Sequence, residues 1–318
     1  MLDVVSVGSA TEDVFVHVRG KLDGEKFCLI PGSKIDIEKM ETFTGGGATN
    51  TSVAFSRLGL NAGILSVVGN DEAAHTVEKN LRDEKVSTEF LVKTKGNTQY
   101  SVILTGFGKD RIILYYSNHT TLGKTKNNLQ KINAKWFYIS SLHEKPDFLK
   151  KIVAHAKKTK SKIAFNPGQQ ELELGVSGFK KLFGKIDVLI LNKEEALKLT
   201  GSADPHRNLE KLSEIAEFVV ITAGKDGAFA TDGNRIYSAK SFEKIEVLDA
   251  TGAGDAFGSG FVSGIIKGKG IEEGLRRGTL NANSVIMYLG TKNILLTEKG
   301  LKEFEKKHGK VKIKKEKL

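Results

Sequence analysis

Short apolar, β-branched runs alternate along the chain with longer segments whose apolar residues recur every three to four positions, the spacing of an amphipathic helix. The short runs predict buried strands. Strands that alternate with helices in this way are typical of a mostly parallel sheet covered on both faces. The expected strands are 4–8, 63–68, 136–140, 162–166, 188–191 and 219–222, and the expected helices are 49–58, 73–84, 146–158, 193–200, 255–267 and 272–289.

Two regions interrupt this alternation. Residues 14–18 and 35–44 are extended and flanked by polar residues, while 99–107 and 111–117 flank Gly108-Lys109-Asp110, which predicts a β-hairpin. We expect these segments to form a small sheet that projects from the main domain. The predicted organisation is a three-layer α/β/α domain with a mostly parallel central sheet (residues 1–12, 46–97 and 118–318) and a small β-lid (residues 13–45 and 98–117).

Composition narrows the class of protein. A hydrophobic content of 39% with 27% charged residues is typical of a globular domain. No apolar run reaches the roughly 18 residues of a membrane span, and the first residues predict a core strand instead of a signal peptide. Cys28 is the only cysteine, which excludes an intrachain disulfide and Cys-containing metal clusters and is compatible with the cytoplasm.

The formal net charge is +11, and much of it lies in a basic C-terminal tail, residues 306–318. A lysine-rich tail predicts a solvated, frayed end. The tail has no interleaved aromatic residues and the chain has no nucleic-acid-binding motif, so a nucleic-acid partner is disfavoured. It remains an alternative in which the tail would bind in a salt-sensitive way. A basic body also suits anionic ligands such as nucleotide phosphates.

The most informative stretch runs from Asp249 to Phe261, where a strand-like run (residues 245–248) leads through Gly252-Ala253-Gly254 into an apolar helix. Free amides at a helix start attract anions, and glycine lets a phosphate approach the backbone. Asp255 could there accept a proton from an attacking hydroxyl, although the helix dipole is expected to lower its pKa. An ordinary tight turn capped by an Asp gives the same pattern. The stretch alone therefore leaves phosphoryl transfer and simple capping open.

A second glycine-rich helix start lies about 200 residues upstream, which suggests two ligands that meet across one cleft. It runs from Gly45 to Ser52. Two other nucleotide-binding motifs are incomplete. Gly123-Lys124-Thr125 lacks the earlier glycine of a P-loop, and no Gly-x-Gly-x-x-Gly follows the first strand, which disfavours a nicotinamide enzyme.

These two stretches resemble the signatures of the ribokinase/PfkB family of sugar and nucleoside kinases. The second signature, residues 249–261, departs from the family only at Ala250, where Thr, Ser, Pro or Val is usual. The resemblance spans nearly the whole chain and implies a ribokinase-like fold with a β-lid, ATP as phosphoryl donor, Mg²⁺ and, as in some members, K⁺. The first signature is matched by Gly45, Gly46, Asn50, Ser52, Gly59 and Gly69.

The resemblance assigns roles to residues on both sides of the predicted cleft. It implies that Asp255 is the catalytic base and that the amides of Gly252, Ala253 and Gly254 hold the transferred phosphoryl group; tight strand–helix packing would demand the same glycines. For Asp13 the alternative is a turn cap. The implied acceptor-binding residues are Asp13, Gly45, Gly46 and Asn50.

On the nucleotide side, Asn192 and Glu195 match the family's Asn-x-x-Glu motif, in which Glu195 would hold Mg²⁺ through water. A capped helix with acidic first-turn residues gives the same pattern. Asp249 and Thr251 match positions near a monovalent cation in potassium-activated members, although an Asp that bonds its own turn explains them equally well. The implied nucleotide-binding residues are Asn192, Thr222, Gly224, Gly227, Thr279 and Asn281.

The resemblance establishes the reaction better than the acceptor. We expect a carbohydrate kinase of the ribokinase or fructokinase type. A nucleoside (adenosine-like) kinase is the first alternative, because residues 165–172 and 290–292 are similar to segments of bacterial adenosine kinases, with Asn166 in place of an Asp. A catalytically silent sugar- or nucleotide-binding regulator is the second. The lid edge could support a homodimer, as in some members of the family.

Overall fold

The computed structural model describes residues 1–318 except 19–21, 25, 108–110, 118–119 and 145. Its centre is a ten-stranded sheet of order β16-β15-β14-β13-β12-β11-β10-β1-β6-β7. The strands from β13 to β7 are parallel, and β14, β15 and β16 continue the sheet in antiparallel fashion. The strands are β1 (Leu2–Val7), β6 (Ala62–Val68), β7 (Ser87–Lys93), β10 (Ala134–Ile139), β11 (Lys162–Phe165), β12 (Ile186–Asn192), β13 (Ala216–Thr222), β14 (Ala228–Thr231), β15 (Arg235–Ala239) and β16 (Ile313–Lys317).

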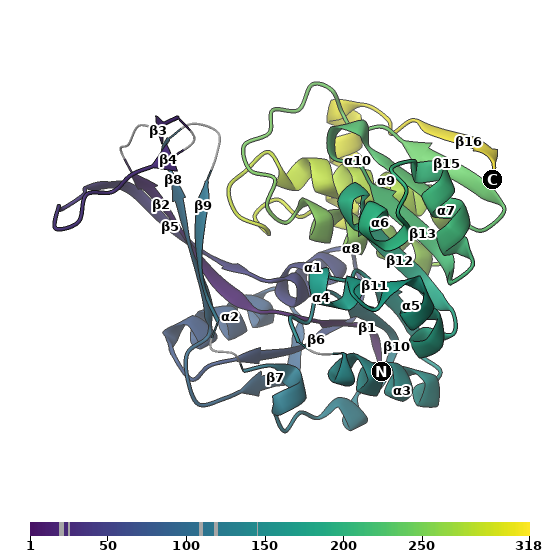
Figure 1. The fold of residues 1–318 in the computed structure, drawn as a ribbon, viewed down its shortest axis with the longest axis horizontal. Helices are drawn as coiled ribbons and strands as arrows, with labels where there is room; N and C mark the ends of the chain where they lie inside the picture. The colour runs from purple at the N-terminus through teal and green to yellow at the C-terminus, as the bar shows by residue number, and fades with distance from the viewer. Residues whose placement is uncertain (19–21, 25, 108–110, 118–119, 145) are drawn as a thin grey trace.

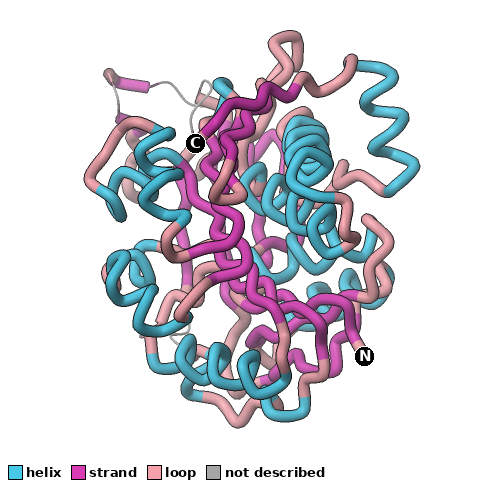
Figure 2. The backbone as a smooth tube through the Cα atoms, turned by 90° about the vertical axis from the view of Figure 1, so that its right-hand side faces the viewer, coloured by secondary structure: helices cyan, strands magenta, loops and turns pink. Residues whose placement is uncertain are grey.

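Helices cover both faces of this sheet, as the edge-on view in Figure 2 shows. Alternation along β10 explains why, because Phe137 and Ile139 enter one apolar core while Trp136 and Tyr138 enter the other. One face is covered by α3 (Asp147–Thr159), α5 (Gly175–Phe183), α6 (Lys193–Thr200) and α7 (Pro205–Ser213), and the other by α1 (Gly47–Arg57), α2 (Glu72–Asp83), α8 (Ala253–Ile266) and α9 (Gly270–Val285).

The remaining elements are short or peripheral. They are α4 (Gln169–Leu172), α10 (Glu298–His308), the 3₁₀ turns η1 (Leu122–Lys124), η2 (Leu129–Lys131) and η3 (Gly224–Asp226), and the small pair β3 (Leu22–Asp23) and β4 (Lys26–Phe27). Within the described ranges, every helix is too short or too polar to span a bilayer.

A second sheet, of order β5-β2-β8-β9, projects from the main body toward the upper left of Figure 1. It comprises β2 (Thr11–Val18), β5 (Ile37–Gly45), β8 (Gln99–Thr105) and β9 (Ile112–Tyr116). The predicted hairpin pairing is present, since β8 and β9 are antiparallel; its loop, Gly108-Lys109-Asp110, lies outside the described residues. Because β2 leads directly from β1 and β5 leads directly into α1, the lid is joined to the large sheet beside the start of α1.

The predicted α/β/α fold with a β-lid is confirmed, and two local predictions are wrong. Residues 245–248 form no strand; Val247 and Leu248 lie in a loop with more than half of their surface exposed, so their apolar pattern does not reflect burial. The tail is not frayed. It continues α10 to His308 and then forms β16, which pairs with β15. Lys315 forms an ion pair with Glu272, and Glu316 contacts His206 Nε2 at 3.3 Å.

Candidate active site

Two helix starts meet at the centre of the molecule. Helix α1 begins after Gly46 and α8 begins after Gly252. At the start of α1, Gly47 N donates to Ser9 Oγ at 3.2 Å and Ala48 N donates to Ser9 O at 3.0 Å. The side chains one turn into each helix are hydrogen bonded: Asn50 Nδ2 donates to Asp255 Oδ2 at 2.8 Å. The two glycine-rich stretches, about 200 residues apart, therefore meet beside a single carboxylate. Of the three amides predicted to hold the transferred group, that of Ala253 already donates to Ala250 O at 3.2 Å.

On the α1 side, glycine is required by close packing. A Cβ at Gly45 would overlap the carboxylate of Asp13, and Gly46 has φ 93° with its would-be Cβ 2.5 Å from Ser9 O. Asp13, on β2, is 8% exposed and accepts a hydrogen bond from Thr11 Oγ1 at 3.1 Å. Burial raises the pKa of Asp13, an effect opposed by hydrogen bonds from Ser101 and Thr11. The structure thus places Asp13 and Gly45 in direct proximity.

The two glycines at the start of α8 differ. Gly252 has φ 80°, and a Cβ there would lie 2.8 Å from the Thr291 side chain, so packing alone demands glycine. A Cβ at Gly254 would meet nothing within 4 Å. Packing therefore does not explain Gly254, and the space beside its backbone is open to a ligand.

Asp255 is the third residue of α8, and the helix is capped by Gly252 instead. Its carboxylate bonds to Asn50, so simple N-capping does not account for it. The expected lowering of its pKa is wrong in sign. Withdrawal from water raises the pKa of Asp255 to about 6, and this outweighs the opposing effects of the Asn50 hydrogen bond and the Lys292 charge. Asp255 is therefore a stronger base than an exposed carboxylate.

Asp249 precedes the turn and bonds to it. Its Oδ1 accepts hydrogen bonds from the backbone N and Oγ1 of Thr251, at 2.9 and 2.6 Å, which is the turn-stabilising role considered as an alternative. The same Oδ1 is 3.3 Å from Arg111 Nη1, which reaches across from the lid. Asp249 Oδ2 is buried without a hydrogen-bond partner among the described residues. An unpaired buried carboxylate oxygen fits a cation ligand.

The Asn-x-x-Glu motif forms a capping box at the start of α6. Asn192 Oδ1 accepts from Glu195 N, and Glu195 Oε2 accepts from Asn192 N, both at 2.8 Å. Burial raises the pKa of Glu195. The buried Tyr138 hydroxyl, which has no partner among the described residues, senses the charges of both Glu195 and Asp255. Both motifs therefore lie near Tyr138, at the carboxyl-terminal edge of the large sheet, where β10 and β12 end.

The nucleotide-side turn begins at the end of β13. Thr222 Oγ1 contacts Leu191 O at 3.5 Å, and Gly224 has φ 55° with open space where a Cβ would lie. Gly227, with φ 93°, packs against the backbone of Ala239, which requires glycine for structural reasons. Of these positions, Gly224 has free space for a ligand.

The two predicted adenine-flanking residues on α9 are buried. Asn281 is fully buried, its Nδ2 donates to Ala256 O at 2.9 Å, and its Oδ1 accepts from Leu296 N at 2.9 Å. Its amide holds α8, α9 and the following loop together, so the prediction of a nucleotide contact is wrong for Asn281. Thr279 is 3% exposed and its hydroxyl has no partner among the described residues.

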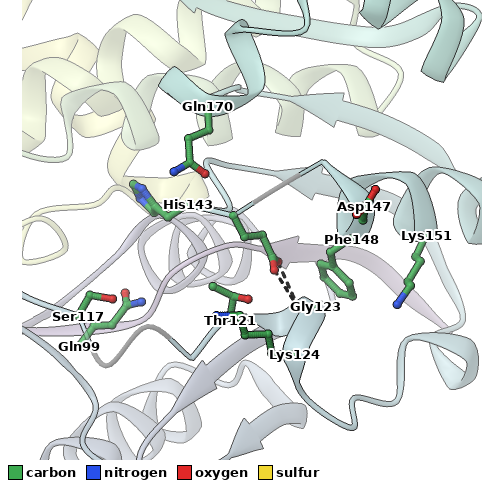
Figure 3. A pocket seen from close by; sticks show the side chains of 11 residues that line it. Gln99, Ser117, Thr121, Gly123, Lys124, His143, Asp147, Phe148, Lys151 and Gln170 are labelled. Atoms are coloured by element: carbon green, nitrogen blue, oxygen red, sulfur yellow. Dashed lines mark hydrogen bonds between the residues drawn. The ribbon is translucent and has the colours of Figure 1, made fainter.

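A cavity of about 390 Å³ lies between the base of the lid and the loop that precedes α3 (Figure 3). In Figure 3, Gln99 and Ser117 line one side of it, and His143 and Gln170 lie above. Glu144 accepts hydrogen bonds from Gly123 N, and burial raises the pKa of its carboxyl. The cavity belongs to the lid side of the molecule, since Gln99 pairs with Thr11, two residues before Asp13 on β2.

Two charged residues of this region had no predicted role in the site. Lys292, in the loop after α9, is almost fully buried against Asn50, and Arg111 bridges the lid to Asp249. One feature of the sequence points to a special role for Lys292, because it is a lone cation between the apolar residues 285–289 and 294–296. Arg111 is a basic residue of the predicted lid, but its contact with Asp249 depends on how the lid meets the main sheet. Among the described residues, no three His, Cys, Asp or Glu side chains gather as a metal centre.

Comparison with known proteins places this geometry in context. The sequence model of the pfkB family carbohydrate kinases matches residues 1–298. The chain is 26% identical over 271 residues to an ATP-dependent 6-phosphofructokinase of Thermoanaerobacterium thermosaccharolyticum, covering 81% of this chain and 84% of that protein. It is 24% identical over 312 residues to a nucleoside kinase of Methanocaldococcus jannaschii, covering 97% and 98%.

Solved structures share the fold. Arabidopsis thaliana ribokinase, solved with ribose and ATP, superposes with a TM-score of 0.80 at 19% identity, covering 95% of this chain and 98% of that one. The Methanocaldococcus jannaschii nucleoside kinase superposes with a TM-score of 0.77 at 22% identity, covering 97% and 99%.

Proposed function

The chain belongs to the PfkB family of carbohydrate kinases, and we propose that it transfers the γ-phosphoryl group of ATP to an alcohol of a sugar. The observation that carries the proposal is the hydrogen bond between Asn50 and Asp255. It joins the helix that starts beside Asp13 to the helix that starts at Gly252, so that one carboxylate borders both a polyol-binding and an anion-binding region.

In the proposed reaction, the acceptor oxygen forms a bond to the γ-phosphorus as the bond from that phosphorus to the β–γ bridging oxygen breaks. The proton of the acceptor hydroxyl passes to Asp255, and ADP leaves. The free amides at the start of α8 would stabilise the charge on the transferred group. With a pKa of about 6, Asp255 is ionised at neutral pH and still basic enough to hold the proton.

Cations would complete the donor side. Mg²⁺ would lie near Glu195, bound through water because Glu195 Oε2 already accepts from Asn192 N, and would offset phosphate charge. A monovalent cation would bind the unpaired Oδ2 of Asp249. Gly224 would let the nucleotide approach the η3 turn.

On the acceptor side, Asp13 would accept hydrogen bonds from sugar hydroxyls. A buried carboxylate gains more from such bonds than an exposed one, because water does not compete for it. Gly45 and Gly46 support this site by allowing the backbone to lie against Asp13 and Ser9.

A nucleoside is the second candidate acceptor, and the cavity in Figure 3 favours it. Its volume of about 390 Å³ is within the range of small-molecule pockets. Gln99, His143 and Gln170 offer the mixture of donors and acceptors that a nucleobase edge presents. A free sugar would leave this space to water.

The test is a coupled ADP-release screen with ribose, fructose, ketodeoxygluconate, adenosine, inosine and cytidine, with ATP alone as the control for hydrolysis. ADP release that depends on a free sugar supports the first proposal. Release that depends on a nucleoside, and that falls in a Gln170→Leu variant with Mg²⁺-ATP KM unchanged, supports the second. Ligand binding without any phosphorylated product would show a silent regulator and refute both.

A further inference from the structure

Lys292 is an unusual residue for a protein interior. It lies in the loop between α9 and α10 and is 7% exposed. Its ammonium donates to the carbonyl oxygen of Thr44, to Asn50 Oδ1 at 3.0 Å and to Thr49 Oγ1 at 3.2 Å. An ammonium has three donors and no acceptor, so these contacts satisfy Lys292 completely. All three partners belong to the segment that leads into and begins α1.

These contacts fix the orientation of the Asn50 amide. Asn50 Oδ1 accepts two hydrogen bonds, from Lys292 and from Thr291 Oγ1 at 2.7 Å. The ammonium has no acceptor, so it would not tolerate the amide's NH₂ group in the same place. The amide nitrogen must therefore point the other way, where it donates to Asp255 Oδ2.

The charges around Lys292 also favour the ionised form of Asp255. Burial lowers the pKa of Lys292 to about 7, while neighbouring carboxylates oppose that fall. The positive charge in turn lowers the pKa of Asp255 and of Asp13 below what burial alone would give. The charged groups that act on Lys292 are Asp13, Asp255, Arg57 and Glu84, and Arg57 also donates to the Lys292 carbonyl oxygen.

Stability alone gives no reason for this arrangement. Taking an ammonium out of water costs several kcal/mol, and replacing buried ionic groups with apolar residues of similar size is often neutral or stabilising. A methionine would fill the same volume. We propose that Lys292 is a positioning residue, whose ammonium locks the Asn50 amide and so holds the Asp255 carboxylate ionised and directed at the acceptor hydroxyl. This inference rests on the proposed role of Asp255.

The test compares Lys292→Met with Thr291→Val. Both variants remove one donor to Asn50 Oδ1, but only the first removes a charge. In Lys292→Met, kcat should fall ~10-fold or more while the KM for Mg²⁺-ATP stays within twofold, and the acid limb of the kcat/KM profile should move up by about one pH unit or more, as expected for loss of an opposite charge. In Thr291→Val, kcat should fall while the acid limb stays in place.

A readout without turnover separates this inference from the proposed function. The ¹³C NMR titration of the Asp255 carboxyl, assigned by its loss in Asp255→Asn, should have its midpoint near 6 in the wild type and at a higher pH in Lys292→Met. An unchanged midpoint overturns the inference whether or not an acceptor is phosphorylated. Absence of turnover in the wild type would refute only the proposed function. If Lys292→Met does not fold, Lys292→Gln replaces it in both measurements.

Discussion

Substitution of Asp255 by Asn should have opposite effects on activity and stability. Burial raises the pKa of Asp255 from 3.8 to about 6, so the folded protein binds this proton more tightly than the unfolded chain does. This tighter proton binding stabilises the folded state fully below about pH 4, and the stabilisation is lost as the pH rises through about 6. At neutral pH the ionised Asp255 therefore costs the folded state free energy.

The size of this cost follows from the shift. A change of about two pKa units corresponds to at most about 3 kcal/mol. Asparagine carries no charge and its Oδ1 can still accept from Asn50 Nδ2. The free energy of unfolding of Asp255→Asn should thus exceed that of the wild type by up to about 3 kcal/mol at pH 8, and the difference should vanish toward pH 4.

Activity should change in the other direction. With a pKa of about 6, the ionised fraction of wild-type Asp255 falls about tenfold between pH 7 and pH 5, and kcat/KM should follow it. Asp255→Asn should lose ~10²–10⁴-fold in turnover, the usual contribution of a general base, and should lack this acid limb.

The assay is urea unfolding of both proteins from pH 4 to pH 8, alongside coupled ADP release over the same range at saturating Mg²⁺-ATP. Near-normal turnover in the folded Asn variant would refute the role of Asp255. A variant less stable than the wild type at every pH would refute the account of its burial. The two failures are independent, because one concerns the reacting proton and the other concerns desolvation.

Two further predictions concern residues outside the acid–base pair. Gly254→Ala should leave the melting temperature within about 2 °C of the wild type, and should raise the KM for Mg²⁺-ATP or lower kcat. Gly252→Ala should destabilise the fold by ~1–3 kcal/mol, because Gly252 has φ 80° and its Cβ would lie 2.8 Å from Thr291. Equal stability losses in the two variants would mean that both glycines serve packing. Glu298→Gln should destabilise by ~1–3 kcal/mol, because the buried Arg277 guanidinium loses a carboxylate that is itself 41% exposed. Glu303→Gln, which breaks an exposed pair on the same helix, should cost under ~0.5 kcal/mol in the same urea unfolding experiment.

The sequence predicted the elements whose pattern is set by burial. The expected strands of the large sheet each lie within an observed strand or end one residue beyond it, because runs such as residues 188–191 face an apolar core on both sides. It did not predict β7, β14, β15 or β16. The edge strand β16 is polar at four of its five positions and owes its place to pairing with β15 and to ion pairs, neither of which periodicity reveals.

Residues of the candidate site were likewise predicted where the signal is local, and not predicted where it depends on contacts between distant elements. Gly45, Gly46, Asn50, Gly252 and Asp255 were predicted, because glycine-rich helix starts have a local signature and the structure brings them together. The sign of the Asp255 pKa shift was not predicted, because the helix dipole can be inferred from the sequence whereas the burial of Asp255 cannot. The structural role of Asn281 and the contact between Arg111 and Asp249 were equally beyond reach, since each depends on packing between distant elements.

The last strand of the large sheet also bears on how the protein behaves at high concentration. Within the part of the chain that the structure describes, β15 is the only strand that pairs with β16, so the outer side of β16 presents unpaired backbone donors and acceptors to which another chain could attach. Lys314 and Lys317 are exposed on this strand and would repel a second copy brought alongside it. High salt would screen that repulsion, and acetylation of these lysines would remove it. Under either condition we expect folded molecules to self-associate through the exposed edge of β16.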